Sequence, residues 1–482
     1  MRSELFIGGA WREGAGERFT SFDPATGDKV WEGRAATADD VAEAMAAARL
    51  AFPGWMRRPV DERVAIVRAF GKAIEAKGAE IAQTISREMG KTAWDAKGEV
   101  AAMVGKVEIS IRAQAERAGA KEERTAFGSM ALSHHAHGVL AAFGPFNFPG
   151  HLPNGHIVPA LLAGNCVIFK PSELTPGVGA LIVAAWEEAG LPAGVLNLVQ
   201  GGRDTGAALL DAHGLNGVLF TGSAQTGALI HRKFAGHPDV LLALELGGNN
   251  PLIAWPPFDL DAAANLIAHS AFATSGQRCS CARRLILPEG KDGDALIERL
   301  RAYIGKIAVG PATQTPEAFM GPLVNAHSAE RAISFEAGLA AAGGKPIVPL
   351  KRDGAFVYPG LIDVTGVNTP DDELFGPLLQ VVRVKDFEHA LDVANATRFG
   401  LAGGLISDDP ALWARVKREL RAGILNWNRP TTGASSALPF GGPGLSGSLR
   451  PSAYYAADYV AYPVAAQIAE KAAPIAAPGL PS

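Results

Sequence analysis

Apolar residues in the first hundred positions recur three and four residues apart, which is the spacing of one face of a helix. The pattern covers residues 36–55 and 60–91 and predicts helices there. Thr37 and Asp61 are expected N-caps, because acidic residues follow each of them in what would be the first helical turn. Gly90 is expected to end the second helical pattern.

The pattern of apolar and polar positions changes near residue 139. Short apolar runs alternate with helical patterns at intervals of roughly 20–30 residues, which is typical of βαβ units and of a parallel sheet covered on both faces. A second region of the same kind follows, so we predict two α/β domains that meet near 246–250, where ELGGNNP supplies linker glycines. The apolar runs of the first region lie at 138–144, 166–170, 194–201, 217–223 and 240–248.

Composition narrows the class of protein. Of 482 residues, 48% are hydrophobic and 20% charged, which provides for a substantial core and excludes a disordered chain. A formal net charge of −4 gives no reason to expect nucleic acid or an anionic membrane as a partner. The apolar runs stop short of a membrane span and the N-terminus lacks a signal-peptide pattern. With only three cysteines, we expect a cytoplasmic protein.

The three cysteines are too few for a disulfide framework and lack the ligand clusters of a structural zinc site. Cys166 lies in the apolar run CVIF, where a buried, inert thiol is expected. Cys279 and Cys281 are separated by the single residue Ser280 in FATSGQRCSCARR, and packing or reactivity remains open for each of them. The histidines of SHHAHG (133–138) also lack a four-ligand pattern, so we expect no metal site.

Polar residues that follow the apolar runs are candidates for ligand binding. Lys170 and Glu173, in FKPSE, end a strand at the edge where open α/β sheets bind ligands, and they can contact a ribose or a phosphate. The alternative is a strand-end lysine beside a surface glutamate. The turn FTGSAQTG (220–227) follows a strand and opens a helix, which suits a phosphate or is only a serine-capped helix start.

Two further residues suit acyl chemistry. Glu245, in LELGG, ends a strongly apolar strand, so burial is expected to raise its pKa toward that of a general base. An ordinary exposed strand-end glutamate is the alternative. Asn147 stands between aromatic residues and prolines in FGPFNFPG, where its amide is either a rigid oxyanion donor or part of a turn.

Along the chain these pieces come in the order amide donor, Lys/Glu pair, phosphate turn, carboxylate base and cysteine. In that order they resemble the aldehyde dehydrogenase superfamily from the LFIGGAW start to about residue 460. The matching motifs are FNFP, FKPSE, FTGS..TG, LELGG, FATSGQRC, ELFGP and PFGG..LSG. The resemblance implies an aldehyde dehydrogenase-like α/β fold with two doubly wound parallel-sheet domains and an oligomerisation hairpin. It also implies an aldehyde as the small-molecule substrate and NAD as the cofactor, with no metal.

The resemblance also assigns parts of the chain to these units. Residues 1–122 and 140–246 would form a Rossmann-like domain that binds NAD. Residues 247–430 would form the catalytic domain with the nucleophilic cysteine. Residues 123–139 and 431–470 would form the hairpin and tail of a homodimer or homotetramer.

For catalysis, the resemblance implies that Cys279 attacks the aldehyde, forming a thiohemiacetal and then a thioester. Asn147 and the Cys279 N–H would hold the oxyanion, and Glu245 would activate the water that hydrolyses the thioester. Cys281 has no matching role, and packing is its expected one. The residues implied in cofactor binding are Lys170 and Glu173 at the adenosine ribose, Gly222, Ser223, Ala224, Gln225, Thr226 and Gly227 in the pyrophosphate turn, and Glu373 and Phe375 at the nicotinamide end.

Three longer stretches, FGPFNFPGHLPNGHIVPALLAGN, LNWNRPTTGASSALPFGG and RPSAYYAADYVAYPVA, resemble the family members that oxidise N-succinylglutamate 5-semialdehyde in bacterial arginine breakdown. Another small semialdehyde is the alternative substrate. Two substrate carboxylates call for cationic contacts, and Arg429 and Arg450 are candidates unless they pair with structural acids. A cofactor-free cysteine hydrolase is disfavoured, because no histidine stands in a matching context.

Overall fold

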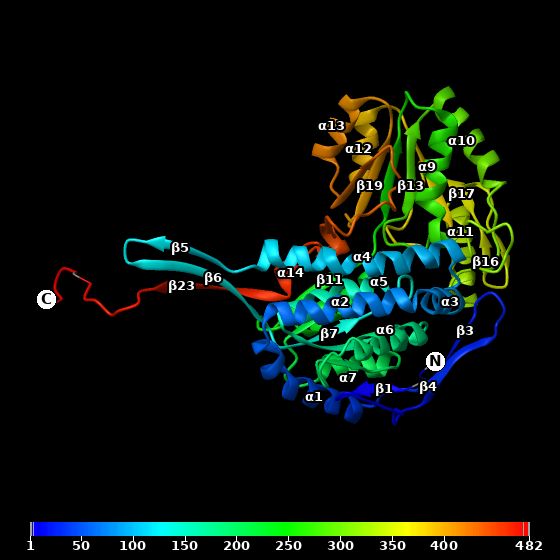
Figure 1. Cartoon of the computed structure of the whole chain (residues 1–482). Helices are drawn as coiled ribbons and strands as arrows, with labels where there is room; N and C mark the ends of the chain where they lie inside the picture. The colour runs from blue at the N-terminus through cyan, green and yellow to red at the C-terminus, as the bar shows by residue number, and fades with distance from the viewer. Residues whose placement is uncertain (1, 3, 476, 481–482) are drawn as a thin grey trace.

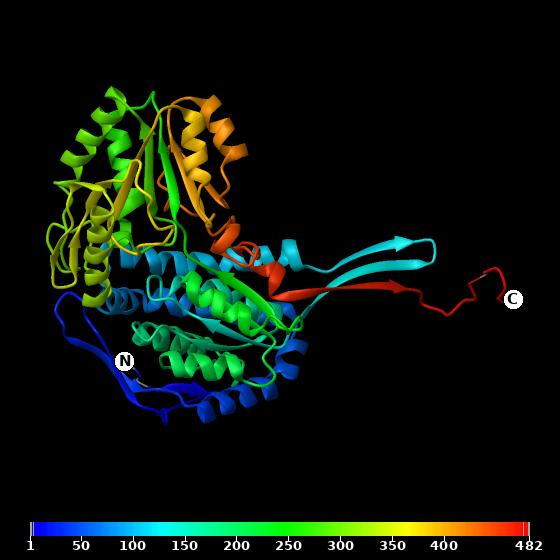
Figure 2. The same ribbon diagram turned by 180° about the vertical axis from the view of Figure 1, so that it is seen from behind.

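The computed structural model describes residues 2, 4–475 and 477–480, so residues 1 and 3 of the first predicted domain lie outside the described residues. Two sheets, each covered by helices, stand one above the other, and a narrow arm of strands extends to one side (Figures 1 and 2). The predicted α/β class with two mainly parallel sheets is confirmed.

The first sheet has seven strands in the order β11-β10-β7-β8-β9-β1-β2, and the five from β11 to β9 are parallel. The chain moves outward from β7 to β9 and then returns through β10 to β11. This reversal places the connecting helices on both faces of the sheet. The strands are β1 (Leu5–Ile7), β2 (Ala10–Arg12), β7 (Val139–Phe143), β8 (Cys166–Lys170), β9 (Leu196–Leu198), β10 (Gly217–Thr221) and β11 (Leu241–Glu245). The connecting helices are α5 (His151–Ala163), α6 (Pro176–Glu188), α7 (Arg203–Asp211) and α8 (Ala224–Lys233).

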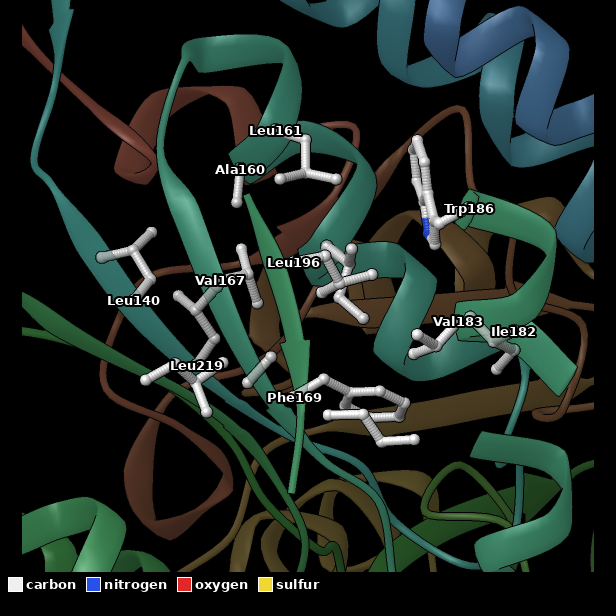
Figure 3. Packing of buried hydrophobic residues seen from close by; sticks show 14 of the residues in the cluster. Leu140, Ala160, Leu161, Val167, Phe169, Ile182, Val183, Trp186, Leu196 and Leu219 are labelled. Atoms are coloured by element: carbon white, nitrogen blue, oxygen red, sulfur yellow. The ribbon is translucent and has the colours of Figure 1, made fainter. Parts of the chain in front are cut away.

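The side chains of this sheet and of the helices that cover it form one hydrophobic core. Figure 3 shows side chains of β7, β8, β9 and β10 meeting those of α5 and α6. The outer side of α6 carries Trp186, whose ring stacks on Phe70 of α2 with centroids 3.8 Å apart. Every residue of β7 and β8 is buried, as expected for parallel strands covered on both faces. The polar residues that follow these strands are therefore held on a rigid base.

Four helices precede the first parallel strand: α1 (Ala38–Arg57), α2 (Val60–Ala76), α3 (Gly78–Met89) and α4 (Ala93–Ala118). Thr37 caps α1 in a capping box, and Gly90 ends α3 with φ of 85°, so both predictions are confirmed. The prediction for Asp61 is wrong, because α2 begins one residue earlier, after Pro59, and has no side-chain cap. The single helical pattern over 60–91 is divided at Lys77.

The second sheet also has seven strands, in the order β14-β17-β18-β13-β12-β19-β20, and only β14 is antiparallel. Side chains of β13 alternate between two cores: Leu285 and Leu287 pack toward α9 and α10, and Ile286 packs toward α12 and α13. The strands are β12 (Asn250–Ala254), β13 (Ala282–Pro288), β14 (Lys345–Val348), β17 (Gly360–Asp363), β18 (Leu378–Val384), β19 (Ala402–Ile406) and β20 (Ile424–Trp427). The helices are α9 (Leu260–Phe272), α10 (Lys291–Ile304), α11 (Ala326–Ala341), α12 (Phe387–Asn395) and α13 (Pro410–Glu419).

The arm is a three-stranded antiparallel sheet in the order β23-β6-β5 (Figure 1). It joins the chain after α4 to the chain near the C-terminus, and His135 of SHHAHG pairs with Tyr462. Its elements are β5 (Lys121–Thr125), β6 (Gly128–Ala136), the short α14 (Ala456–Tyr459) and β23 (Ala461–Ile468). The remaining elements are β3 (Arg18–Phe22), β4 (Lys29–Arg34), η1 (Ala273–Gly276), β15 (Lys351–Asp353), β16 (Phe356–Tyr358), β21 (Pro439–Phe440), η2 (Gly444–Ser446) and β22 (Ser452–Ala453). None of the helices in the described residues is long and apolar enough to cross a membrane.

Candidate active site

One large cavity, of about 1670 Å³, lies between the two sheets. The first sheet supplies residues at or just after the carboxyl ends of its strands, such as Asn147, Lys170 and Glu245. The second sheet supplies residues that precede the amino ends of its strands, such as Cys279 before β13 and Glu373 before β18. The structure brings every predicted catalytic and cofactor-binding residue to this cavity except Gly227, which lies one turn into α8 behind its wall.

A tight, left-handed turn carries Cys279 into the cavity. Thr274, Ser275 and Gly276 have φ of 55°, 56° and 74°, a conformation that costs side-chain-bearing residues free energy. A Cβ on Gly276 would overlap the carbonyl oxygen of Gly376. The strain is therefore held by close packing between this turn and the segment that leads into β18.

Asn250, the first residue of β12, fixes the other side of the same turn. Its side-chain amide donates to the carbonyl oxygens of Cys279 and Cys281, at 2.7 and 2.8 Å. Its Oδ1 accepts from the Ala402 N–H at 3.0 Å. One buried side chain thus ties the cysteine turn to two strands of the second sheet.

The three thiols differ in their surroundings. Cys166 and Cys281 are fully buried, and burial raises the pKa of Cys166 to about 12. Cys279 alone is partly exposed, at the cavity wall. Burial raises the pKa of Cys279 as well, and the nearby carboxyls of Glu373 and Glu245 raise it further. Cys279 is the thiol that a ligand in the cavity can reach, and it is protonated before a ligand arrives.

Asn147 occupies the loop between β7 and α5, and its side chain is buried at the cavity wall. The amide donates to the carbonyl oxygen of Gln277 at 2.9 Å, which uses one of its two N–H groups. This bond joins the loop after β7 to the turn that carries Cys279. A fixed amide beside a thiol can donate its remaining N–H to an oxygen bound there.

Glu245, the last residue of β11, is only 4% exposed. Its Oε1 accepts from the Ser452 N–H at 3.3 Å, and Oε2 has no hydrogen-bond partner among the described residues. Burial raises the pKa of Glu245 well above its usual range. A carboxyl with one unsatisfied oxygen and a raised pKa is suited to accept a proton from water. The prediction of a raised pKa is confirmed, and the exposed alternative is wrong.

Glu373 and Phe375 face the cavity from the segment before β18. Arg283 of β13 lies 3.3 Å from the Glu373 carboxylate and 5.5 Å from the Phe375 ring centroid. Phe146 meets the same ring edge-on, with centroids 5.9 Å apart. A Cβ on Gly247 would overlap Glu373 Oε2, so the first glycine of LELGG is needed for this carboxylate to lie where it does.

At the far end of the cavity, Ser223 caps α8 by accepting from the Thr226 N–H at 3.2 Å. The capping role does not exclude an anion, because residues of the first helical turn line the cavity and a helix N-terminus leaves further N–H groups without an intrahelical partner. Lys170 is buried and donates to the Pro171 carbonyl oxygen at 3.0 Å. The Glu173 side chain is 52% exposed, and its carboxylate lies 3.8 Å from Lys170 Nζ.

A buried charge network that sequence reasoning missed supports both catalytic loops. Lys91 contacts Glu99 at 2.7 Å, and Asp95 contacts Arg278 at 2.9 Å. Glu99 also accepts from the two backbone N–H groups that begin α5, at 2.8 and 3.0 Å. The ring of Phe148 lies between the two cations, 3.3 Å from Lys91 and 5.1 Å from Arg278. The amino-terminal half of α4 thereby fixes the Asn147 loop and the cysteine turn together.

Arg283 and Asn250 were also missed, although the sequence carries a signal for each. Two arginines at the start of the apolar strand ARRLILP, and a second asparagine in GGNNP, are polar residues at positions that should be buried. Arg429 and Arg450, in contrast, are exposed and do not line the cavity. Within the described part of the chain, no group of His, Cys, Asp or Glu is arranged to hold a metal ion.

Comparison with known proteins agrees with this geometry. Residues 11–462 match the model of the aldehyde dehydrogenase family. The chain belongs to the aldehyde dehydrogenase family. It is an oxidoreductase that oxidises aldehydes, which is the chemistry of this family.

Two relatives cover nearly the whole chain. The N-succinylglutamate 5-semialdehyde dehydrogenase of Paraburkholderia xenovorans (strain LB400) is 53% identical over 467 residues, 96% of each chain. N-succinylglutamate 5-semialdehyde dehydrogenase 2 of Caulobacter vibrioides is 55% identical over 472 residues, again 96% of each chain. The high identity extends across both sheets and the arm.

Solved structures share the fold at lower identity. A putative aldehyde dehydrogenase from Burkholderia cenocepacia has a TM-score of 0.92 at 30% identity, with 98% of this chain and 99% of that chain covered. The methylmalonate-semialdehyde dehydrogenase of Oceanimonas doudoroffii has a TM-score of 0.91 at 28% identity, with 98% of each chain covered.

The close contact between Gly247 and the Glu373 carboxylate can be tested by adding a methyl group at Gly247. Gly247→Ala should lower kcat/KM for aldehyde oxidation by about 10-fold or more, because the new methyl group displaces the Glu373 carboxylate and breaks its contact with Arg283. The melting temperature should change by only a few degrees, because a flexible side chain can yield. Gly236→Ala, with nothing within 4 Å of the added Cβ, is the control and should change neither value. Unchanged kcat/KM in Gly247→Ala would contradict the role of this carboxylate.

Proposed function

We propose that the protein oxidises N-succinyl-L-glutamate 5-semialdehyde to N-succinyl-L-glutamate in arginine catabolism, with NAD as the cofactor. The substrate assignment rests on sequence identity above 50% with relatives named N-succinylglutamate 5-semialdehyde dehydrogenase, over 96% of both chains. Another small semialdehyde is the second candidate, since the fold neighbours include a dehydrogenase named for a different one. The cytoplasm as the site of this reaction is part of the proposal.

Cys279 is the proposed nucleophile. As substrate binds, the Cys279 thiol loses its proton to water, its sulfur forms a C–S bond with the aldehyde carbon, and the aldehyde oxygen becomes the oxyanion of a thiohemiacetal. The free amide N–H of Asn147 and the backbone N–H of Cys279 would donate to this oxyanion. The hydrogen bonds from Asn147 to Gln277 and from Asn250 to the cysteine turn support this proposal, because they fix both donors before substrate binds.

The cavity has the residues that a dinucleotide needs. Its volume exceeds that of pockets for drug-sized ligands, which is roughly 300–1,000 Å³, and leaves room for a substrate beside the cofactor. NAD, when bound, supplies the acceptor for the hydride that leaves the substrate carbon. We propose that Lys170 and Glu173 hold its adenosine ribose and that Glu373 and Phe375 hold the nicotinamide end. The proposed pyrophosphate turn comprises Gly222, Ser223, Ala224, Gln225, Thr226 and Gly227.

Glu245 is the proposed base of the second half-reaction. Loss of hydride leaves an acyl group on Cys279 as a thioester. Glu245 would take a proton from water, the hydroxyl would add to the thioester carbon, and the C–S bond would break to release the carboxylate and the thiol. Its burial and its unpartnered Oε2 support this role, because both favour accepting a proton.

We also propose that different parts of the chain bind the cofactor, carry out catalysis and assemble the oligomer. Residues 1–122 and 140–246 would bind NAD, and residues 247–430 would provide the nucleophile. Residues 123–139 and 431–470 would assemble a homodimer or homotetramer. The outer strands of the arm support assembly, because an unpaired strand edge is a template for pairing with another chain.

The proposed substrate is tested with a panel of aldehydes. With NAD and purified protein, kcat/KM for N-succinylglutamate 5-semialdehyde should exceed that for succinic semialdehyde and for butanal by at least about 10-fold, because only the first substrate carries the N-succinyl group and both carboxylates of the proposed substrate. The readout is absorbance of reduced nicotinamide. A preference for either of the other aldehydes would overturn the substrate assignment while leaving aldehyde oxidation intact.

The base is tested by Glu245→Gln. The amide cannot take a proton from water, so thioester hydrolysis should become about 100-fold slower or more while the first half-reaction continues. Rapid-mixing absorbance should show one equivalent of reduced cofactor per site in a burst, followed by a slow steady rate. Loss of the burst in a folded variant would mean that Glu245 acts before hydride transfer.

The cofactor is tested by comparing NAD with NADP at one fixed aldehyde. A Glu173 carboxylate at the ribose would repel a 2′-phosphate, but its exposure weakens the repulsion, so we expect a preference for NAD of about 10-fold in kcat/KM. Glu173→Gln should narrow this ratio, and Glu75→Gln on the outer side of α2 should leave it unchanged. Equal use of NADP by the unmodified protein would contradict the placement of Glu173 at the ribose.

A further inference from the structure

Lys106 of α4 is a buried cation that the reaction outlined above does not use. We propose that Lys106 binds a carboxylate of the semialdehyde substrate and so selects acidic aldehydes. The inference rests on the proposed function, which supplies a substrate with carboxylates. It adds the residue that recognises them.

The surroundings of Lys106 leave its charge unneutralised. The residue lines the cavity, yet it is only 2% exposed. Among the described residues, Lys106 Nζ has no hydrogen-bond partner and no carboxylate within 4 Å. A buried ammonium without a counter-charge is costly, and burial accordingly lowers the pKa of Lys106 to about 8. A bound carboxylate would remove that cost.

The neighbours on α5 do not supply the missing negative charge. Burial and the charge of Lys106 lower the pKa of His151 to about 4 and that of His156 to about 3, so both rings are neutral at neutral pH. The ring nitrogens of His156 are already bonded to the hydroxyls of Tyr459 and Thr221, at 2.9 and 3.1 Å. Neutral rings leave the field of Lys106 uncompensated in this part of the cavity.

The two nearby cations differ from Lys106, because their charges are already paired. Lys91 contacts Glu99 at 2.7 Å, and Arg278 contacts Asp95 at 2.9 Å. These pairs support the catalytic loops and cannot bind a new anion without giving up a partner. Lys106 can form a charge-assisted hydrogen bond with a substrate carboxylate at no such cost.

The position of Lys106 on its helix points to the substrate and not to the cofactor. Gly98, Ala102 and Lys106 are four residues apart, so they lie along one face of α4, and all three line the cavity. The two small residues leave room for a chain of substrate atoms between the Asn147 loop and the ammonium. The proposed pyrophosphate turn is on a different element, the start of α8.

Lys106→Met tests the proposal, because methionine keeps the length of the side chain and removes the charge. With NAD, the variant should lose about 10- to 100-fold in kcat/KM for N-succinylglutamate 5-semialdehyde and for succinic semialdehyde, mainly through KM. Its kcat/KM for butanal should stay within about 3-fold of the unmodified protein. Lys97→Met, on the exposed side of the same helix, removes the same charge and should change none of the three values.

Product binding gives a second readout. The inhibition constant of N-succinyl-L-glutamate, measured against butanal as substrate, should rise by about 10-fold or more in Lys106→Met. Lys106→Arg keeps a cation and should restore part of the kcat/KM for the acidic aldehydes and part of the affinity for the product. This variant also provides a test if Lys106→Met folds poorly. An equal loss for butanal and the acidic aldehydes would make Lys106 a structural residue and overturn the proposal, as would an unchanged kcat/KM for the acidic aldehydes.

The panel separates this inference from the substrate assignment. If the unmodified protein prefers succinic semialdehyde, the assigned substrate is wrong, and the Lys106→Met comparison with succinic semialdehyde and butanal still decides the role of Lys106. If the unmodified protein prefers butanal to both acidic aldehydes, a carboxylate-selecting Lys106 is wrong as well.

Discussion

Removal from water is the constraint on which the chemistry of this protein depends. The cavity between the two sheets holds Cys279, Glu245, Glu373 and Lys106 away from bulk water, and in each of them this desolvation shifts the pKa toward the uncharged form. The same exclusion of water strengthens every hydrogen bond that a bound carbonyl oxygen can receive. Glu245 Oε2 and Lys106 Nζ have no hydrogen-bond partner among the described residues, and a bound ligand can provide one.

The two sheets achieve this by presenting opposite edges to each other. Parallel strands of the first sheet end at the cavity, and those of the second begin there, so loops from distant parts of the chain meet. Hydrogen bonds between elements then hold the loops in place: Asn147 reaches Gln277, Asn250 holds the cysteine turn, and Arg283 contacts Glu373. The close fit of Gly247 shows how little space separates these loops.

Much of the fold could be predicted, because periodicity and local chemistry determine it. Thr37 begins a helix through its side chain and Gly90 ends one through its backbone freedom, as predicted, whereas Asp61 does not cap α2, because that helix starts directly after Pro59. The motif residues were found because each follows or precedes a strand. Arg283 and Lys106 could not be assigned, since the role of a buried cation depends on partners that only the fold supplies. The exposure of Arg429 and Arg450 could not be read from sequence for the same reason.

The central claim is that Cys279 carries the acyl group, although Cys281 is only two residues away. Protein mixed with NAD and N-succinylglutamate 5-semialdehyde can be quenched in acid during turnover, where a thioester survives, and the peptide with both cysteines can be fragmented in a mass spectrometer. We predict that the acyl mass lies on Cys279, persists there in Cys281→Ala and disappears in Cys279→Ala together with turnover. An acyl group on Cys281, or continued turnover by Cys279→Ala, would contradict the account.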